Sequence, residues 1–554
     1  MAHRSYLSRI GTQSLGALLA LFTGACGTGA DATPATGVQP FSGALPSSPL
    51  AQPATTGQAT ATPGTETTPD ANDTSGSSPE NQAGDLPLNA GSDTTGDNPG
   101  AAPTGDGTAA APATPASDAM TPPATTPPAT TPPAMTPPAT TPDAPAPPSG
   151  VVIERPTKGT TDLFTTLIGK TPAEVDDKLS RAVNLYFGIG TNESPTPVVN
   201  QGYRVYYELP QDPSMAFIWA ADSNDIRSEG MSYGMFISVQ MDMQPQFDRL
   251  WKFARTYMQF AGNANPATWR SYFRWQGSVN TGNAQNWGVN FGAQTGPAPD
   301  GDQYFATALY LAARRWGNNG GTNYKQEADN IAHAMLTNAA AGGNTPLFQQ
   351  NLPVFFPSGN NATFTDPSYN LPAFYELFAL DGPQGDSARW RQMANTSRAL
   401  FVSSANAQTG LHPDYANFNG TPNNGGSNHD TFRYDAWRVV MNMAIDYSWF
   451  SQDARERTQV EKYHAFFGNH LAGNNVDNAL FALNGSGASG GGSTALTSTL
   501  ASGALASQAA NRTAFVQAAW DVAQQSGQYR YYQESVYLLG LLASSGVYGY
   551  EWAQ

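Results

Sequence analysis

The chain has 554 residues and a formal net charge of −16 at pH 7. No basic patch or stripe stands out, so nothing in the sequence supports nucleic-acid binding. Cys26 is the only cysteine, which excludes a disulfide bond within the chain. From Asp31 to Asp143 there are eleven Asp or Glu residues and no Lys or Arg. Most of the net charge therefore belongs to one solvated segment and says little about a ligand.

Residues 1–25 have the features of a bacterial secretory signal. Arg4 and Arg9 precede the apolar run LGALLALF, and small residues follow it in TGAC. The apolar run is too short for a membrane span. Cys26 resembles the acylated cysteine of a lipobox, although Thr23 stands where an aliphatic residue is usual. We therefore expect export to the cell envelope, with lipidation at Cys26 as the only contact with the membrane and plain secretion as the alternative.

Residues 26–151 predict a disordered linker. They are built from Ala, Thr, Pro, Gly and Asp and end in the repeat TPPATTPPATTPPAMTPPATTP. Such a segment has too little apolar surface to offset its chain entropy, and repeated proline stiffens it toward polyproline II. All eleven tryptophans lie beyond the linker. We therefore expect one folded domain, at 152–554, and a monomer.

The folded part is dominated by helical periodicity. The stretch TPAEVDDKLSRAVNLYF (171–187) begins with Thr171, Pro172 and Glu174, which is typical of a helix start. Alternating βαβ patterning is missing, and β-rich stretches are few. Paired helices in a domain of this size favour an α/α toroid, although a solenoid would give a similar pattern. Further amphipathic runs occupy residues 230–260, 302–316, 325–341, 371–380, 387–403, 430–450, 454–468, 495–507, 512–526 and 530–544.

The stretch SEGMSYGM (228–235) places one carboxylate, Glu229, in a small and almost neutral setting. Glu229 opens the 230–260 run, where the helix dipole favours a negative charge. An isolated Glu at this position is therefore most simply a helix-terminal acid. Two further acidic stretches change that interpretation.

The first is APDGDQYFATALYLAARRWG (298–317), in which Asp300 and Asp302 precede an apolar helix. The DGD sequence could begin a calcium loop, but Tyr304 stands where the third acid would be needed and no glutamate closes the loop. Calcium binding is therefore not expected. The alternative for Asp300 is a plain helix N-cap.

The second is HDTFRYDAWRVVMNMAIDYSWF (429–450), which predicts a helix with Asp435 inside it and Arg438 three residues further on. Residues at this spacing lie on one helix face, so the two side chains can form a structural ion pair. A carboxylate held ionised by a neighbouring guanidinium is also what a general base requires.

Together these three stretches resemble glycoside hydrolase family 8, whose members are inverting enzymes with an (α/α)6 barrel. APDGDQYFATAL is similar to the family signature, SEGMSYGM to its acid-bearing segment and YDAWRV to its base-bearing helix. The resemblance covers about 160–550. Within the family, FTDPSYNLPAFYELFAL (364–380) resembles the branch of xylanases and reducing-end xylose-releasing exo-oligoxylanases.

The resemblance implies roles for four residues. Glu229 would be the general acid, Asp435 the general base and Asp300 the acid that positions the sugar. Tyr369 would help to hold the attacking water, whereas without the resemblance it would be an ordinary aromatic anchor. No cofactor is implied. The sequence has no Cys/His cluster with metal-ligand spacing, so no metal site is expected.

The neighbours of Glu229 fit the role of an acid. If Met231, Tyr233 and Met235 pack around the carboxyl group, they would desolvate it and keep it protonated near neutral pH. Aromatic side chains are also needed, because sugar rings present apolar faces that Trp and Tyr can cover. Trp316 and Trp449 end apolar helices and are expected in the core. The predicted substrate-binding residues are Tyr233, Trp287, Tyr369, Trp437 and Arg438.

The mode of cleavage depends on loops around the cleft. In the exo-acting branch a Leu-His-Pro kink near the C-terminal part closes the cleft, whereas this chain has the Gly/Ser-rich run NGSGASGGGSTALTSTLASGALAS at 484–507. Such a run lacks the bulk and rigidity to block a subsite. His470 in AFFGNHLAGNN is the other candidate for a barrier.

We therefore expect internal cleavage of β-1,4-linked xylan or xylo-oligosaccharides. The first alternative is release of xylose from the reducing end, and the second is an endo-β-1,4-glucanase or chitosanase. A glycan-binding protein that has lost catalysis is a different class, which the presence of both Glu229 and Asp435 disfavours.

Overall fold

The computed structural model describes residues 153–260, 269–280, 288–291, 295–338 and 346–553. The predicted signal and linker, with Cys26, lie outside the described residues, and so does Trp287. The described chain is mostly helical, which confirms the prediction of a helical domain.

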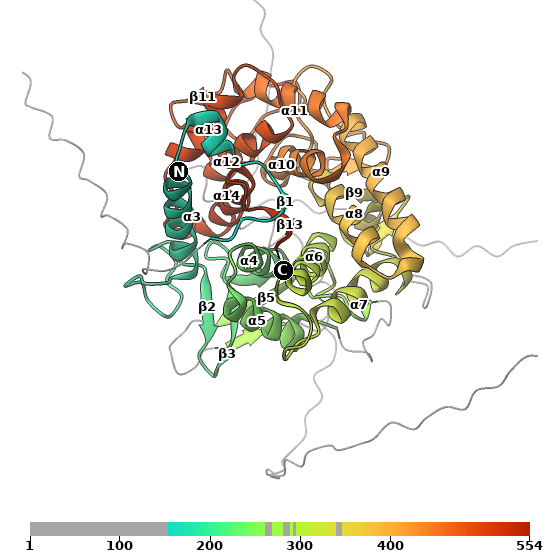
Figure 1. Cartoon of the computed structure of the whole chain (residues 1–554). Coiled ribbons are helices and arrows are strands. Elements are labelled where there is room, and N and C mark those ends of the chain that lie inside the picture. Colours follow the sequence, from blue (N-terminus) through green and yellow to red (C-terminus); the bar gives the residue numbers. More distant parts are fainter. Residues whose placement is uncertain (1–152, 261–268, 281–287, 292–294, 339–345, 554) are drawn as a thin grey trace, which may run out of the picture. The chain divides into compact units, whose positions relative to one another are not determined.

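The helices form an inner and an outer set (Figure 1). Neighbouring inner helices contact one another, and the last returns to the first, so their contacts close a ring. In ring order they are α4 (Ser228–Gln240), α6 (Pro299–Trp316), α8 (Pro372–Asp381), α10 (Val439–Asp446), α12 (Thr494–Ser502) and α14 (Arg530–Ser544). Each packs mainly against one outer helix: α5 (Gln244–Phe253), α7 (Tyr324–Thr337), α9 (Ser387–Ser403), α11 (Ala454–Phe467), α13 (Arg512–Asp521) and α3 (Pro172–Phe187), in the same order.

The inner helices are buried over most of their length, because other elements surround them. Every residue of α10 and α12 is buried. In α12, TALTSTLAS, serine and threonine hydroxyls donate to carbonyl oxygens one turn back, so these polar groups can be buried. Gly540 of α14 faces Ser498, and a Cβ at Gly540 would lie only 2.7 Å from backbone atoms of Ser498. This glycine lets α12 and α14 pack closely.

Two predicted helices are broken in the structure. The 230–260 run is split into α4 and α5 by a turn in which Asp242 has φ 58°, and it ends in the π-helical η2 (Ala254–Met258). The predicted 430–450 helix begins only at the 3-10 turn η8 (Tyr434–Arg438), continues as α10 and ends in the π-helical η9 (Tyr447–Ser451). Extended backbone at Arg433, φ −164°, prevents an earlier start. Asp435 therefore lies in a 3-10 turn and not inside an α-helix.

Short strands connect and close the helical ring. Strands β1 (Lys158–Gly159) and β13 (Gly549–Glu551) pair antiparallel and join the two ends of the described domain. The other strands are β2 (Tyr206–Leu209), β3 (Asp212–Ile218), β4 (Asp225–Arg227), β5 (Gln276–Asn280), β6 (Gly288–Asn290), β7 (Phe348–Gln349), β8 (Leu352–Pro353), β9 (Phe364–Thr365), β10 (Ala416–Asn417), β11 (Leu471–Ala472) and β12 (Asn475–Val476). The remaining helical segments are α2 (Leu163–Ile168), η5 (Gly359–Ala362), η6 (Pro367–Tyr369), η7 (Gln384–Asp386), η10 (Gly503–Leu505) and η11 (Gly527–Tyr529).

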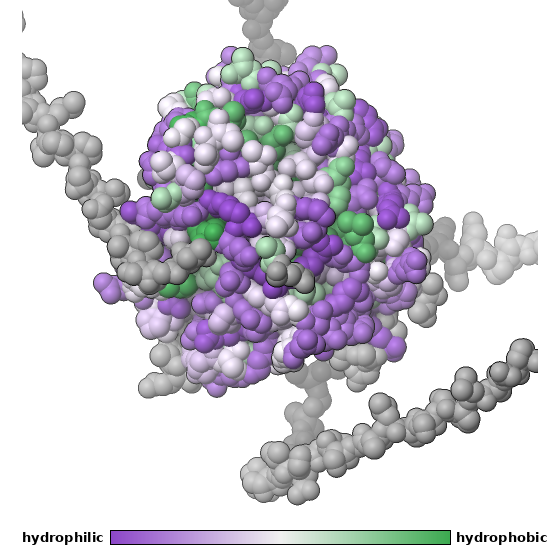
Figure 2. Space-filling view, viewed as in Figure 1, coloured by the Kyte–Doolittle hydropathy of each residue, from purple (hydrophilic) through white to green (hydrophobic). Residues whose placement is uncertain are grey.

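The surface is mainly polar on the face shown in Figure 2, where apolar patches are small and separate. Within the described ranges, no helix combines the length and the apolar character that crossing a membrane requires.

Candidate active site

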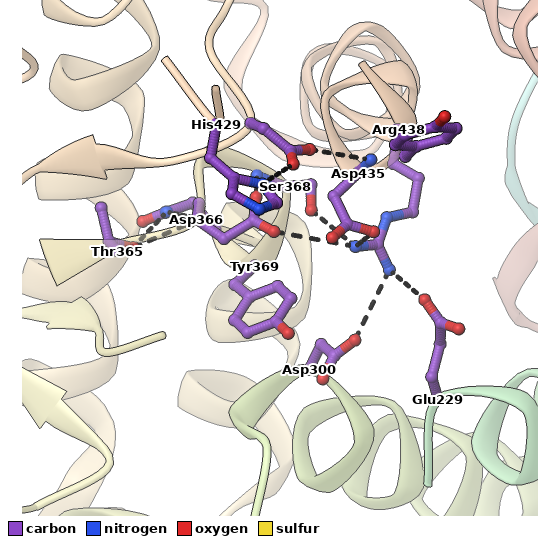
Figure 3. A network of polar contacts seen from close by, with 12 residues as sticks. Glu229, Asp300, Thr365, Asp366, Ser368, Tyr369, His429, Asp435 and Arg438 are labelled. Atoms are coloured by element: carbon purple, nitrogen blue, oxygen red, sulfur yellow. Dashed lines mark hydrogen bonds and ion pairs between the residues drawn. The ribbon is translucent and has the colours of Figure 1, made fainter. Parts of the chain in front are cut away.

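Three acidic residues meet where the first turns of α4 and α6 face the turn η8 (Figure 3). Glu229 comes from α4, Asp300 from α6 and Asp435 from η8. The guanidinium group of Arg438 lies between them. Its Nη1 is 3.0 Å from Glu229 Oε1 and 3.5 Å from Asp300 Oδ2, and its Nη2 is 2.8 Å from Asp435 Oδ1. The three acids predicted from separate stretches thus share one cation.

Close packing of two helix starts brings Glu229 and Asp300 together. A Cβ at Gly301 would lie 2.4 Å from Ser228 Oγ and 3.0 Å from the Ser228 carbonyl carbon, so only glycine lets α6 approach α4 this closely. The N-cap of α6 is Ala298, and Asp300 lies in the first turn with 4% of its surface exposed. The alternative reading of Asp300 as a plain N-cap is therefore wrong.

Arg438 is a buried cation with several partners. Its side chain is 3% exposed, and Nη2 also donates to Ser368 Oγ at 2.8 Å. Nη1 donates to the Tyr233 hydroxyl, and the guanidinium lies 5.8 Å from the centre of the Tyr369 ring. Burial alone would lower the pKa of Arg438, but the surrounding phenols and carboxylates outweigh burial and raise it.

Burial also has the largest influence on the pKa of Glu229 and on that of Asp300. Burial raises the pKa of Glu229, and the negative charge of Asp435 adds to this effect, while Arg438 and Arg227 oppose it. Burial also raises the pKa of Asp300, to about 7, with Arg438 opposing and the charges of Glu229 and Asp435 adding to the rise. The Asp435 side chain is the most open of the three at 25% exposed, against 14% for Glu229.

Tyr531 is a partner of Glu229 that was not predicted from the sequence. Its hydroxyl donates to Glu229 Oε2 at 2.9 Å from the start of α14. A Cβ at Gly230 would lie 2.4 Å from the Tyr531 ring, so the glycine after Glu229 makes room for this contact. Nothing near Tyr531 in the sequence points to a partner 302 residues away. Met231 was expected to pack around the Glu229 carboxyl group. Its sulfur instead accepts a hydrogen bond from the backbone N–H of Ile218.

Two further buried carboxyl groups, Asp366 and Asp414, lie beside Asp435 and were also missed. Asp414 Oδ1 accepts from the Asp435 backbone N–H at 3.1 Å, and its Oδ2 lies 2.5 Å from His429 Nδ1. Burial raises the pKa of Asp414, and the charge of Asp435 adds to it. Asp414 thus fixes the backbone of the turn that presents Asp435.

Of the predicted aromatic residues, the three that the structure describes are nearly buried, and Tyr233 and Tyr369 lie against Arg438. Tyr369 is 7% exposed, Trp437 3% and Tyr233 1%. The Trp437 indole N–H donates to the Ala479 carbonyl oxygen, and its ring packs on Tyr434 and Tyr532.

Trp316 and Trp449 pack against the core, as expected. Within the described ranges, no group of three or more His, Cys, Asp or Glu side chains is arranged to hold a metal ion.

We expect Arg438→Met to lower the free energy of unfolding by about 3–5 kcal/mol at pH 7, because buried carboxylates lose their cation. Without Arg438, Glu229 and Asp300 hold their protons to still higher pH in the folded state. A group whose folded-state pKa is raised destabilises the fold as pH rises, so the loss should be smaller at pH 4 than at pH 8. Thermal melting across this pH range measures it.

Arg455→Met is the matched control. Arg455 also pairs with an aspartate, Asp453, but its side chain is 54% exposed. Little change is expected there, because exposed ion pairs contribute little to stability. An equal effect of the two substitutions, or a loss from Arg438→Met that does not vary with pH, would contradict the central role of Arg438.

Comparison with known proteins agrees with this arrangement. The family model for glycosyl hydrolases family 8 matches residues 217–546. The reducing-end xylose-releasing exo-oligoxylanase Rex8A of Paenibacillus barcinonensis is 35% identical over 358 residues, which are 62% of this chain and 87% of that protein. The reducing end xylose-releasing exo-oligoxylanase of Halalkalibacterium halodurans is 33% identical over 356 residues, 63% of this chain and 86% of that protein.

A solved structure extends the similarity to the fold. The xylohexaose complex of a catalytic mutant of a GH8 xylanase from Teredinibacter turnerae is 36% identical, with a TM-score of 0.63 over 71% of this chain and 98% of that chain. The family match alone covers more than half of the chain. This chain is a glycosidase that belongs to glycosyl hydrolase family 8, a family of inverting enzymes.

Proposed function

We propose that this protein is an inverting glycosidase with an (α/α)6 barrel that hydrolyses β-1,4-linked xylo-oligosaccharides, with Glu229 as the general acid and Asp435 as the general base. The observation that carries the assignment is the pair of carboxyl groups on one guanidinium. Glu229 is the more buried, with a raised pKa, while Asp435 is the more open and binds Arg438 at 2.8 Å. The family relationship supports the same pair.

The reaction needs one proton delivered and one removed. Glu229 gives its proton to the glycosidic oxygen as the bond to the anomeric carbon breaks. A water attacks that carbon from the opposite face and loses a proton to Asp435, so the configuration inverts. Exchange with solvent then restores both groups. Asp300 positions the sugar, and Tyr369 holds the water beside Arg438.

The raised pKa of Glu229 sets the alkaline limit of the activity. The acid must be protonated to work, and burial raises its pKa. Activity should therefore extend toward neutral pH and fall as Glu229 loses its proton.

Release of xylose from the reducing end is the mode that we propose. The names of both curated relatives describe this mode. These comparisons favour it over the internal cleavage expected from the sequence.

Internal cleavage is the second candidate, and one segment favours it. The segment from Ala479 folds back on itself: Leu480 pairs with Ser489, and the Ala482 N–H donates to the Ser486 carbonyl oxygen. Residues 484–489 at its tip, NGSGAS, have short side chains and are largely exposed. The segment begins beside Trp437, which donates to Ala479. The other suspected barrier, His470, packs on Phe466 and Phe481 under this segment.

We expect Glu229→Gln and Asp435→Asn each to lower kcat by about 10²–10⁴, the range for positioned acid–base catalysis. A xyloside with an activated phenol as leaving group needs no proton from the enzyme. It should therefore restore part of the activity of the Glu229 variant and none of that of the Asp435 variant. Steady-state rates on xylo-oligosaccharide and aryl xyloside measure this difference.

Two outcomes would remove the assignment: equal rescue of both variants, or wild-type rates from either. The wild-type enzyme serves as the stereochemical control. Proton NMR of the first-formed product should show the α-anomer, because inversion converts a β-linkage into an α-hydroxyl.

Xylohexaose separates the two modes of cleavage. Xylose and xylopentaose as the only first products are the expected result, and early xylobiose and xylotriose would instead support internal cleavage. Parallel assays of reducing-sugar release on xylan, carboxymethylcellulose and chitosan test the substrate class. A preference for either of the last two would contradict xylo-oligosaccharides as the substrate.

We further propose that the protein is exported and anchored through a lipid on Cys26. Small residues in TGAC after a short apolar run support this proposal. The wild type should then fractionate with membranes, and Cys26→Ser should release it or block its processing. Wild type found wholly in the culture medium, with its first residue upstream of Cys26, would identify a secreted enzyme.

A further inference from the structure

Asp366 is a fully buried carboxyl group that the proposed reaction leaves without a role. It is 0% exposed and precedes the turn η6. Figure 3 shows its carboxyl group directed toward Asp435 and the guanidinium group of Arg438. The shortest ion-pair distance, from Asp366 Oδ2 to Arg438 Nη2, is 4.0 Å, which is too long for a hydrogen bond.

One oxygen of Asp366 shapes the site. Oδ1 accepts from the Ser368 backbone N–H at 2.7 Å and so caps the turn η6. This turn presents Ser368, whose hydroxyl accepts from Arg438, and Tyr369, whose ring lies beside the same guanidinium. The backbone oxygen of Asp366 is held as well, by Asn370 Nδ2 at 3.0 Å. The side chain therefore has a fixed orientation.

The other oxygen, Oδ2, is buried and has no hydrogen-bond partner among the described residues. Asp435 and Arg438 face Asp366 from η8, and Asp414 faces it from the loop after α9, where His429 binds Asp414. Burial raises the pKa of Tyr369, which lies on the same turn, and that of Tyr415, and the charge of Asp366 adds to both effects. Burial raises the pKa of Asp366 well above its usual value, and the charge of Asp435 adds to this effect.

An ionised Asp366 would be unfavourable here for two reasons. It would leave a buried negative oxygen without a donor, and it would place a second anion beside Asp435. The second anion would compete with Asp435 for Arg438 Nη2. A protonated Asp366 avoids both problems, because its Oδ2–H is a donor directed toward Asp435.

We propose that Asp366 is a positioning residue that acts as a neutral, protonated group: Oδ1 fixes the turn that carries Ser368 and Tyr369, and Oδ2–H faces Asp435, so that Asp366 does not compete with Asp435 for Nη2 of Arg438. This inference rests on the proposed role of Asp435 as the base. It adds a requirement that the role of Asp435 alone does not imply, namely that the carboxyl group next to the base stays uncharged.

Asp366→Asn and Asp366→Leu separate the neutral form from the charged form. An asparagine keeps the acceptor for the Ser368 N–H and offers an N–H donor toward Asp435, but it cannot ionise. We expect kcat of Asp366→Asn to stay within about 10-fold of wild type, since one hydrogen-bonding group replaces another. Leucine provides neither group, and kcat should fall by about 100-fold or more, as when a catalytic group loses its position.

The acidic limb of the pH profile of kcat provides a second test of the proposal, and this test needs only the Asn variant. If Asp366 is already neutral in the wild type, the limb set by ionisation of Asp435 should stay at the same pH in Asp366→Asn. If Asp366 is ionised, its replacement removes a neighbouring negative charge, favours ionised Asp435 and moves the limb to lower pH. Such a shift would overturn the proposal.

Two results for kcat would also overturn the proposal. One is a loss in Asp366→Asn as large as that in Asp366→Leu, and the other is near wild-type kcat in both variants. Thermal melting of each variant checks that the fold is kept, and the pH comparison stands even where the Leu variant does not fold. Asp435→Asn is assayed in parallel. Wild-type activity in Asp435→Asn would contradict the role of Asp435 as the base. If Asp435→Asn is inactive, the results for the two Asp366 variants test the role of Asp366 alone.

Discussion

The pairing of Arg438 with the carboxyl groups around it is the interaction on which the rest of the site depends. A buried guanidinium without partners would cost several kcal/mol, and each buried carboxylate would cost a similar amount. Here Glu229, Asp300 and Asp435 come from three separate parts of the chain and meet on one cation. The cation and the acids compensate one another only when the ring of inner helices is closed. The site and the fold therefore stabilise each other.

The direction of the inner helices also helps to offset the cost of burying these carboxylates. Glu229 and Asp300 lie in the first turns of α4 and α6, where unpaired backbone N–H groups favour negative charge. These helix starts touch because Gly301 lacks a side chain. Even so, one arginine cannot neutralise every nearby carboxyl group. The raised pKa values of Asp366 and Asp414, both due first to burial, indicate that some of these groups keep their protons.

The sequence predicted most of the helices and all three acids, because both leave local patterns. Helix α3 begins where Thr171, Pro172 and Glu174 predicted a helix start, and the spacing of Asp435 and Arg438 indicated that the two could form an ion pair. Contacts between distant segments leave no such pattern. The contact of Tyr531 with Glu229 and that of Asp414 with the Asp435 backbone depend on how the ring closes. The break before η8 depends on backbone angles at Arg433 that its side chain does not dictate.

The two proposed catalytic carboxyl groups share Arg438, so the arginine alone cannot give them opposite protonation states. Burial is what distinguishes them. Glu229 is the less exposed, and the pKa of Glu229 is raised although both Arg438 and the Tyr531 hydroxyl favour its ionised form. Asp435 is the more exposed and has its own contact with Nη2 of Arg438. A neutral Asp366 completes this separation, because any charge there would act on Asp435 first. The difference between acid and base thus arises from the packing around each carboxyl group.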